Sequence, residues 1–123
     1  MNIVLIHYAA PPVVGGVEAV MGRQARLMAD AGHHVCVIGG RGAQTDARVE
    51  FVSIPEVDSR NPEVLELKAE LDAGRVPVKF EPLALRLASR LAEETEGADW
   101  IIAHNVCSLN KNLALTAALH RIS

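Results

Sequence analysis

The stretch IVLIHYAAPPVVGGVEAVMGRQARLMADAGHHVCVIGG, residues 3–40, decides the fold of this chain. It begins with an apolar, β-branched run at residues 3–6 and ends with a second such run at residues 35–38. Between the two runs, apolar residues recur at helical spacing, and Gly32 follows them as a helix stop. These apolar positions are Val17, Val20, Met21, Leu27, Met28 and Ala31. A strand, a helix and a second strand predict a βαβ unit with parallel strands.

The rest of the chain continues this alternation of strands and helices. Residues 49–54 and 100–103 are short apolar runs, which are typical of strands buried in a parallel sheet. Asn61 and Pro62 have the residue types of a helix cap and a first helical residue. Helices are predicted over residues 61–73, 82–96 and 110–122. We therefore expect a Rossmann-like, three-layer α/β/α fold with a parallel sheet of strand order 3-2-1-4.

Composition limits the classes of function. The 123 residues fit one domain, and the net charge of -3 and the aromatic content of 3% argue against a nucleic-acid partner. No apolar stretch approaches the roughly 20 residues of a membrane span, and the chain starts without the basic segment of a signal peptide. Cys36 and Cys107 lie in apolar runs, so we expect buried, reduced thiols in a cytoplasmic protein.

Two adjacent glycines, Gly15 and Gly16, separate the first strand from a helix expected to begin near Val17. Because glycine has no Cβ, a ligand can reach the backbone there, and the free N–H groups of a helix start attract anions such as phosphate. Glu18 suits the helix dipole, and it could also hold the loop or meet a substrate hydroxyl. The alternative is a tight turn that needs glycine for geometry alone.

Other phosphate-binding motifs do not match. A dinucleotide fingerprint needs G-x-G-x-x-G and an acidic residue after the second strand, but that strand is followed by Gly-Gly-Arg-Gly at residues 39–42. The P-loop pattern G-x-x-x-x-G-K-[ST] is absent. A phosphorelay receiver would have acidic residues where this chain has His7 and Tyr8.

Two histidines are expected at one mouth of the sheet. His7 follows the first strand and His104 follows the fourth, and these strands are neighbours in the order 3-2-1-4. Ligands of open α/β sheets bind at such a switch point, so both histidines and Asn105 are predicted to line a crevice with the glycine pair. His33 and His34 fall at the opposite end of the sheet and are expected to be structural.

Two segments resemble the N-terminal region of family 4 glycosyltransferases, which are retaining, nucleotide-sugar-dependent enzymes of the GT-B fold. The first is GGVEAVMGRQARLMADAGHHVCVIG, in which Gly15, Gly16 and Glu18 match the Gly-Gly-x-Glu loop and residues 32–35 match a Gly-His-x-Val entry to the second strand. The second is ADWIIAHNVCSLNKNLALTAALHRI, which is similar to a fourth strand that ends in histidine and leads into a helix. Asn105 departs from the second histidine that is more frequent near this position.

The resemblance implies that residues 1–123 are a partial N-terminal, acceptor-side domain, the truncated half of a GT-B fold. The C-terminal domain, which holds most of the nucleotide sugar, has no counterpart here, so the fragment is expected to be inactive alone. The intact enzyme would transfer a sugar from a nucleotide-sugar donor to an acceptor with retention, without a metal or other cofactor.

The resemblance also assigns site residues. The amides of Gly15 and Gly16 would approach the donor diphosphate, and His104 would act as a catalytic residue beside the reacting sugar. The implied acceptor contacts are His7, Glu18, Asn105, Asn110 and Asn112. A peripheral membrane contact of the full-length enzyme and self-association of the fragment through an open sheet edge are both compatible with this assignment.

Three alternatives stay open. The chain could be a stand-alone receiver-like or nucleotide-binding α/β module, or half of a GT-B-like sugar-nucleotide epimerase. A zinc site made by His7, His104 and Cys107 lacks the close-spaced pair of ligands that usually marks such sites.

Overall fold

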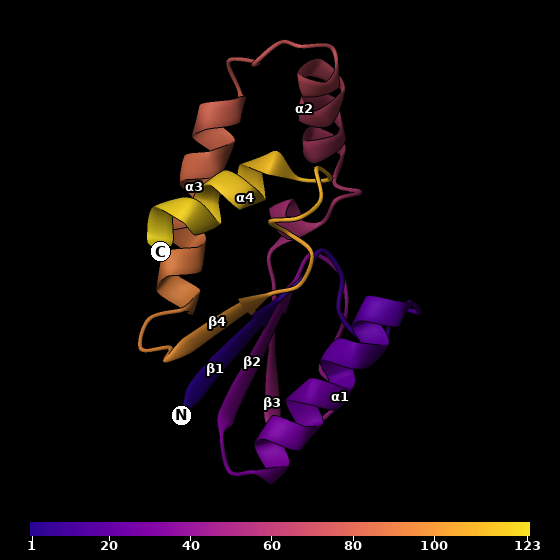
Figure 1. The fold of residues 1–123 in the computed structure, drawn as a ribbon, viewed down its shortest axis with the longest axis vertical. Helices are drawn as coiled ribbons and strands as arrows, with labels where there is room; N and C mark the ends of the chain where they lie inside the picture. Colours follow the sequence, from indigo (N-terminus) through magenta and orange to yellow (C-terminus); the bar gives the residue numbers. More distant parts are fainter.

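The computed structural model describes residues 1–123 and contains one sheet of four parallel strands (Figure 1). The strand order is β3-β2-β1-β4, which confirms the predicted α/β class and the predicted order. The strands are β1 (Asn2–Ile6), β2 (His34–Gly39), β3 (Val49–Ser53) and β4 (Trp100–Ala103).

The fold has four α-helices and one short 3-10 helix, of which α4 follows the last strand. They are α1 (Gly16–Asp30), η1 (Pro55–Val57), α2 (Pro62–Asp72), α3 (Phe80–Glu94) and α4 (Leu113–Ile122). The side chain of Asn61 accepts hydrogen bonds from the N–H groups of Glu63 and Val64, so the predicted cap of α2 is confirmed. Helix α4 begins three residues later than predicted, because Asn112 and not Asn110 caps it by accepting from the Leu115 N–H.

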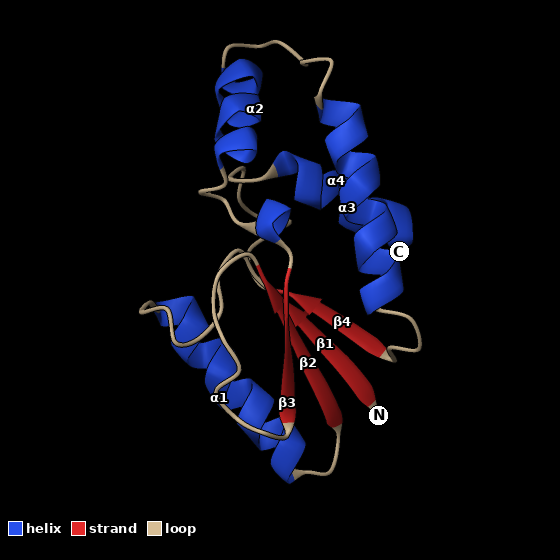
Figure 2. Ribbon diagram, turned by 180° about the vertical axis from the view of Figure 1, so that it is seen from behind, coloured by secondary structure: helices blue, strands red, loops and turns tan.

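The helices are distributed unevenly about the sheet. Figure 2 shows α1 alongside one face, while α2, α3 and α4 gather beyond the carboxyl ends of the strands. One apolar cluster lies between α1 and the sheet and includes Ile3, Leu5 and Met21. A larger cluster joins the other face to α3 and α4, with Ile6 and Ile38 at the sheet. Burying these clusters is the main stabilising term available to the fold.

Helix α1 packs through a narrow stripe of three buried residues. Met21, Gly22 and Ala25 are buried, whereas Val20 and Leu27, which the helical pattern placed among the apolar positions, are largely exposed. A Cβ on Gly22 would lie 3.1 Å from the ring of Pro11, so glycine lets the loop after β1 approach the helix closely. The packed stripe is therefore narrower than the apolar pattern of the sequence suggests.

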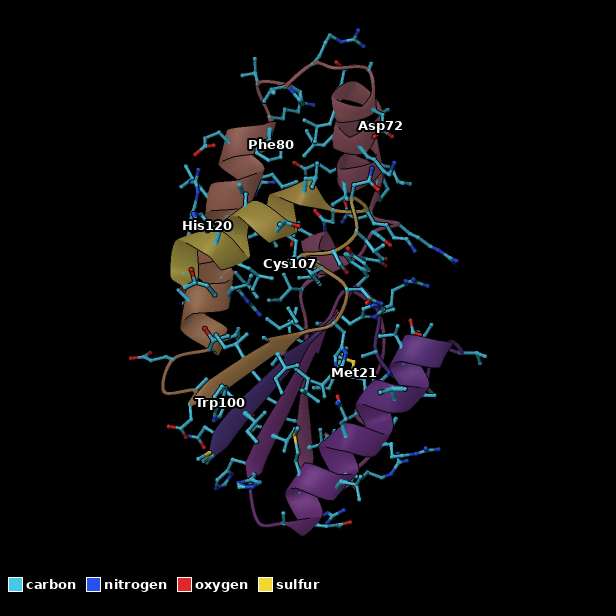
Figure 3. The ribbon with its side chains drawn as sticks, viewed as in Figure 1. Met21, Asp72, Phe80, Trp100, Cys107 and His120 are labelled. Atoms are coloured by element: carbon cyan, nitrogen blue, oxygen red, sulfur yellow. The ribbon has the colours of Figure 1, made fainter.

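The fold leaves one edge of the sheet open at β4 and exposes one of its two thiols. Strand β4 pairs only with β1, and Trp100 on this edge is 61% exposed. Cys36 is partly buried but Cys107 is exposed, so the expectation of a second buried thiol is wrong. Cys107 lies in the loop between β4 and α4 (Figure 3).

None of the helices is both long enough and apolar enough to cross a lipid bilayer.

Candidate site at the carboxyl ends of β1 and β4

His7 and His104 are neighbours across the sheet. The register pairs Ile6 with Ala103, and the His104 N–H continues the ladder by donating to the Ile6 carbonyl oxygen at 2.8 Å. Residues at equivalent positions of parallel strands point to the same face. Both side chains therefore leave the sheet on the side that carries α1, and both find polar partners on that helix.

The imidazole of His7 is buried and held by its own loop. Its Nδ1 lies 2.7 Å from the carbonyl oxygen of Ala9, which can only accept, so Nδ1 carries the proton. The carboxylate of Glu18 lies 3.7 Å from the same nitrogen. No hydrogen bond of the structure uses Nε2.

The imidazole of His104 is held by helix α1. Its Nε2 lies 2.8 Å from Oε1 of Gln24, across 80 positions of sequence. Burial lowers the pKa of His104, and the electrostatic interaction with His7 lowers it further. His104 is therefore predominantly neutral at neutral pH.

The glycine pair lies at the start of α1. Gly15 is extended, with φ at 172°, and the Gly15 carbonyl accepts the N–H of Ala19 to begin the helix. A Cβ on Gly16 would meet no atom within 4 Å, and Gly16 does not have a positive φ. The turn therefore needs no glycine at position 16 for its geometry, which argues against the tight-turn alternative at this residue.

Glu18 lies between the glycines and the histidines. Its Oε2 occupies the space beside Gly15, because a Cβ built on that glycine would lie only 2.2 Å from this oxygen. A carboxylate in the first turn of a helix is favourable to the helix dipole. The anion nearest the start of α1 is thus a side chain of the protein itself, and it also faces His7.

The three predicted asparagines separate into different environments. Asn105 follows His104 directly, is exposed, and has a left-handed backbone with φ at 61°. Asn112 is 2% exposed and donates to the carbonyl oxygens of Glu56 and Val57, at 2.8 and 3.2 Å. The predicted acceptor contact for Asn112 does not fit this geometry, because its amide is consumed in capping α4 and tying it to η1.

Asn110 is exposed and borders a small cleft against α2, which Leu67 and Leu71 also line. The structure thus brings together five predicted residues and places Asn105 beside them. Contacts link four of the five, His7, Gly15, Glu18 and His104, and Gly16 follows Gly15 with no other group within 4 Å of a Cβ built on it. Asn110 and Asn112 lie instead with α2 and η1.

Two residues at this mouth were not predicted. Gln24 lies three positions after the buried Met21 and therefore on the same face of α1. A polar residue on this otherwise apolar face was the signal in the sequence for a buried polar contact. Figure 3 shows Met21 pointing from α1 toward the sheet. Tyr8 is 3% exposed, and its hydroxyl is buried without a hydrogen-bond partner. Nothing in the local sequence distinguishes Tyr8 from an ordinary core tyrosine.

The largest depression of the structure lies elsewhere. It encloses about 650 Å³ and borders the opposite ends of β1 and β2, where His33, His34 and Cys36 are found. Burial raises the pKa of Cys36 to about 11, and the carboxylates of Glu50 and Glu94 add to this effect. A thiol that stays protonated is a poor nucleophile and a poor metal ligand. We therefore place the candidate site at the carboxyl ends of β1 and β4, where His7 and His104 lie, and call this region the mouth.

The fold and this mouth define a Rossmann-like α/β domain with two histidines and a glycine pair at its switch point. No group of three or more histidine, cysteine, aspartate or glutamate side chains is arranged to hold a metal ion. Comparisons with protein families and with curated proteins find no match to this chain.

Proposed function

We propose that the chain is the acceptor-side domain of a retaining, nucleotide-sugar-dependent glycosyltransferase. The observation that carries the proposal is the open space over Gly16, at the start of the helix whose Glu18 and Gln24 contact the two histidines at the ends of β1 and β4. A glycine that the fold does not require is explained if a ligand must reach the backbone there. The resemblance of residues 15–39 to the Gly-Gly-x-Glu loop supplies the chemical class of that ligand.

In this proposal the two halves of the mouth have different tasks. The amides of Gly15 and Gly16 stabilise negative charge that develops on the leaving diphosphate, aided by the helix dipole. The neutral imidazole of His104 accepts a hydrogen bond from a sugar hydroxyl. Glu18 moves away from Gly15 when the diphosphate arrives and stays beside His7, because two anions cannot share the start of α1. The donor itself is carried by a second domain.

The first test is to read the gene past the codon of Ser123. A following α/β domain with a pair of glutamates eight positions apart supports the proposal. A stop codon directly after Ser123 contradicts it and favours a stand-alone module.

The second test measures nucleoside diphosphate release by the full-length enzyme with a panel of nucleotide sugars. Gly16→Val should abolish release, because its side chain occupies the space of the diphosphate. Ala19→Val is the matched control, since Ala19 is an exposed residue of the same helix and the added bulk is also β-branched. Equal release by wild type and Gly16→Val would overturn the proposal.

A further inference from the structure

Gln24 is the one α1 side chain that hydrogen-bonds His104. The contact joins Gln24 Oε1 to His104 Nε2 at 2.8 Å, well within the range of an N–H···O hydrogen bond. A side-chain carbonyl oxygen accepts and never donates, so His104 must supply the proton from Nε2. Because the imidazole is neutral, its other nitrogen, Nδ1, then carries a free lone pair.

The same arrangement occurs at His7 with the two nitrogens exchanged. The Ala9 carbonyl oxygen accepts a hydrogen bond from His7 Nδ1, and Nε2 has no partner in the protein. No hydrogen bond of the structure uses His7 Nε2 or His104 Nδ1. Each of the two neighbouring rings thus has one nitrogen hydrogen-bonded to a carbonyl-type oxygen and one nitrogen without a partner in the protein. A neutral imidazole whose tautomer is fixed by an acceptor on one nitrogen is prepared to bind a hydrogen-bond donor with the other.

We propose that Gln24 is a positioning residue for His104: it holds the proton on Nε2 and so presents Nδ1 as an acceptor for a ligand hydroxyl. Gln24 touches His104 and acts through it. The assignment of the hydroxyl to a sugar rests on the proposed function, whereas the tautomer is a property of this chain alone.

The Gln24–His104 contact links His104 to the helix that begins at Gly16. Gln24 lies two turns after Gly16 on the same helix, so the glycine pair and the residue that orients His104 belong to one rigid element. The packed stripe of Met21, Gly22 and Ala25 fixes that helix against the sheet. Helix α1 therefore fixes the position of the proposed diphosphate site at Gly15 and Gly16 relative to the proposed hydroxyl site at His104.

The test is ¹⁵N NMR of the imidazole of His104 at pH 7.5. We expect a protonated Nε2 with a slowly exchanging proton and an unprotonated Nδ1. Gln24→Met, which keeps length and removes the acceptor, should lose the slowly exchanging proton. Gln44→Met is the matched control, because Gln44 donates only to the carbonyl oxygens of Asp46 and Val49. Protonation of Nδ1 in the wild type, or an unchanged spectrum in Gln24→Met, would overturn the proposal.

Gln24→Glu gives a second readout that does not depend on the folding of Gln24→Met. A carboxylate at this position still accepts from Nε2 and stabilises the imidazolium, so the pKa of His104 should rise above that of the wild type. The charged or titratable group that also acts on this titration is His7, which follows β1 and faces Glu18 of α1, and both residues are unchanged in the variant. An unaltered pKa would contradict the contact. If the NMR results hold while no nucleotide sugar is consumed, the proposed function fails and the role of Gln24 stands.

Discussion

Two glycine pairs follow neighbouring strands of the same sheet, and they differ in what surrounds them. Gly39–Gly40 ends β2, and a Cβ on Gly40 would lie 2.2 Å from the Cβ of Asp58 and 2.4 Å from its backbone nitrogen. Gly15–Gly16 follows β1, and a Cβ on Gly16 would meet nothing within 4 Å. The fold itself therefore requires glycine at position 40 but not at position 16.

The close approach at Gly40 has a structural purpose. It admits Asp58, which is buried, accepts a hydrogen bond from Arg41 Nε at 2.6 Å and accepts the N–H of Arg60 at 2.9 Å. Where another residue occupies the space that a side chain would need, packing explains the glycine. Where that space is open, packing does not explain it. This difference supports the proposal that a ligand binds at the first pair.

The largest expected effect is the loss of stability in Gly40→Ala. The new Cβ overlaps the backbone of Asp58, so the loop after β3 has to move, which should cost about 3 kcal/mol of unfolding free energy. Urea denaturation followed by circular dichroism measures this change. A Gly40→Ala protein as stable as the wild type would remove the contrast between the two pairs.

The asparagines of the 105–112 loop give the next largest effect. Asn112→Ala removes the cap of α4 and leaves the carbonyl oxygens of Glu56 and Val57 without a donor, for a loss of about 2 kcal/mol. Asn110→Ala is the matched control on the exposed part of the same loop and should change stability by less than about 0.5 kcal/mol. A loss in Asn112→Ala as small as that expected for Asn110→Ala would show that Asn112 is not a structural residue.

Acidification should destabilise the protein through His104. Because its pKa is lower in the folded state than the ordinary value of 6.5, the unfolded chain binds more protons between these two values. The His104 contribution to the unfolding free energy is therefore constant at pH values above the unfolded-state pKa of 6.5. It falls as the pH drops from there toward the lower pKa of the folded state. His104→Gln should lose less stability than the wild type between pH 7.5 and 5.5 in matched urea titrations. Parallel pH profiles would contradict the burial of this imidazole.

The smallest effect on stability is expected for Gly16→Ala. An added methyl group meets open space, and alanine restricts the unfolded chain more than glycine does, so stability should stay within about 0.5 kcal/mol of the wild type or rise slightly. Thermal unfolding of Gly16→Ala beside Gly40→Ala tests the comparison directly. A large loss in Gly16→Ala would mean that the fold needs this glycine after all.

Much of the fold was accessible from the sequence, because it depends on local patterns. Apolar runs located all four strands, and Asn61 with Pro62 located the start of α2. Their order along the chain was enough to predict the strand order, since βαβ crossovers leave few topologies. Helix ends such as that of α4 were less accurate, because Asn110 and Asn112 offer the same capping chemistry two residues apart.

The site was only partly accessible, for a physical reason. Strand ends predicted that His7 and His104 meet, but the partners of a side chain depend on packing between distant segments. Asn105 and Asn112 look alike in sequence, yet one is exposed and the other is buried among backbone carbonyls. Gln24 was missed because its role depends on a contact 80 positions away.

The central claim is that the amides of Gly15 and Gly16 form an anion site. It is tested most directly by titrating this chain with inorganic pyrophosphate while recording ¹H–¹⁵N spectra. We predict shifts confined to the amides of residues 15–18, a stronger response in Glu18→Gln because the competing carboxylate is gone, and no response in Gly16→Val. Shifts that fail to appear at residues 15–18, or that appear equally at Gly39 and Gly40, would contradict the account.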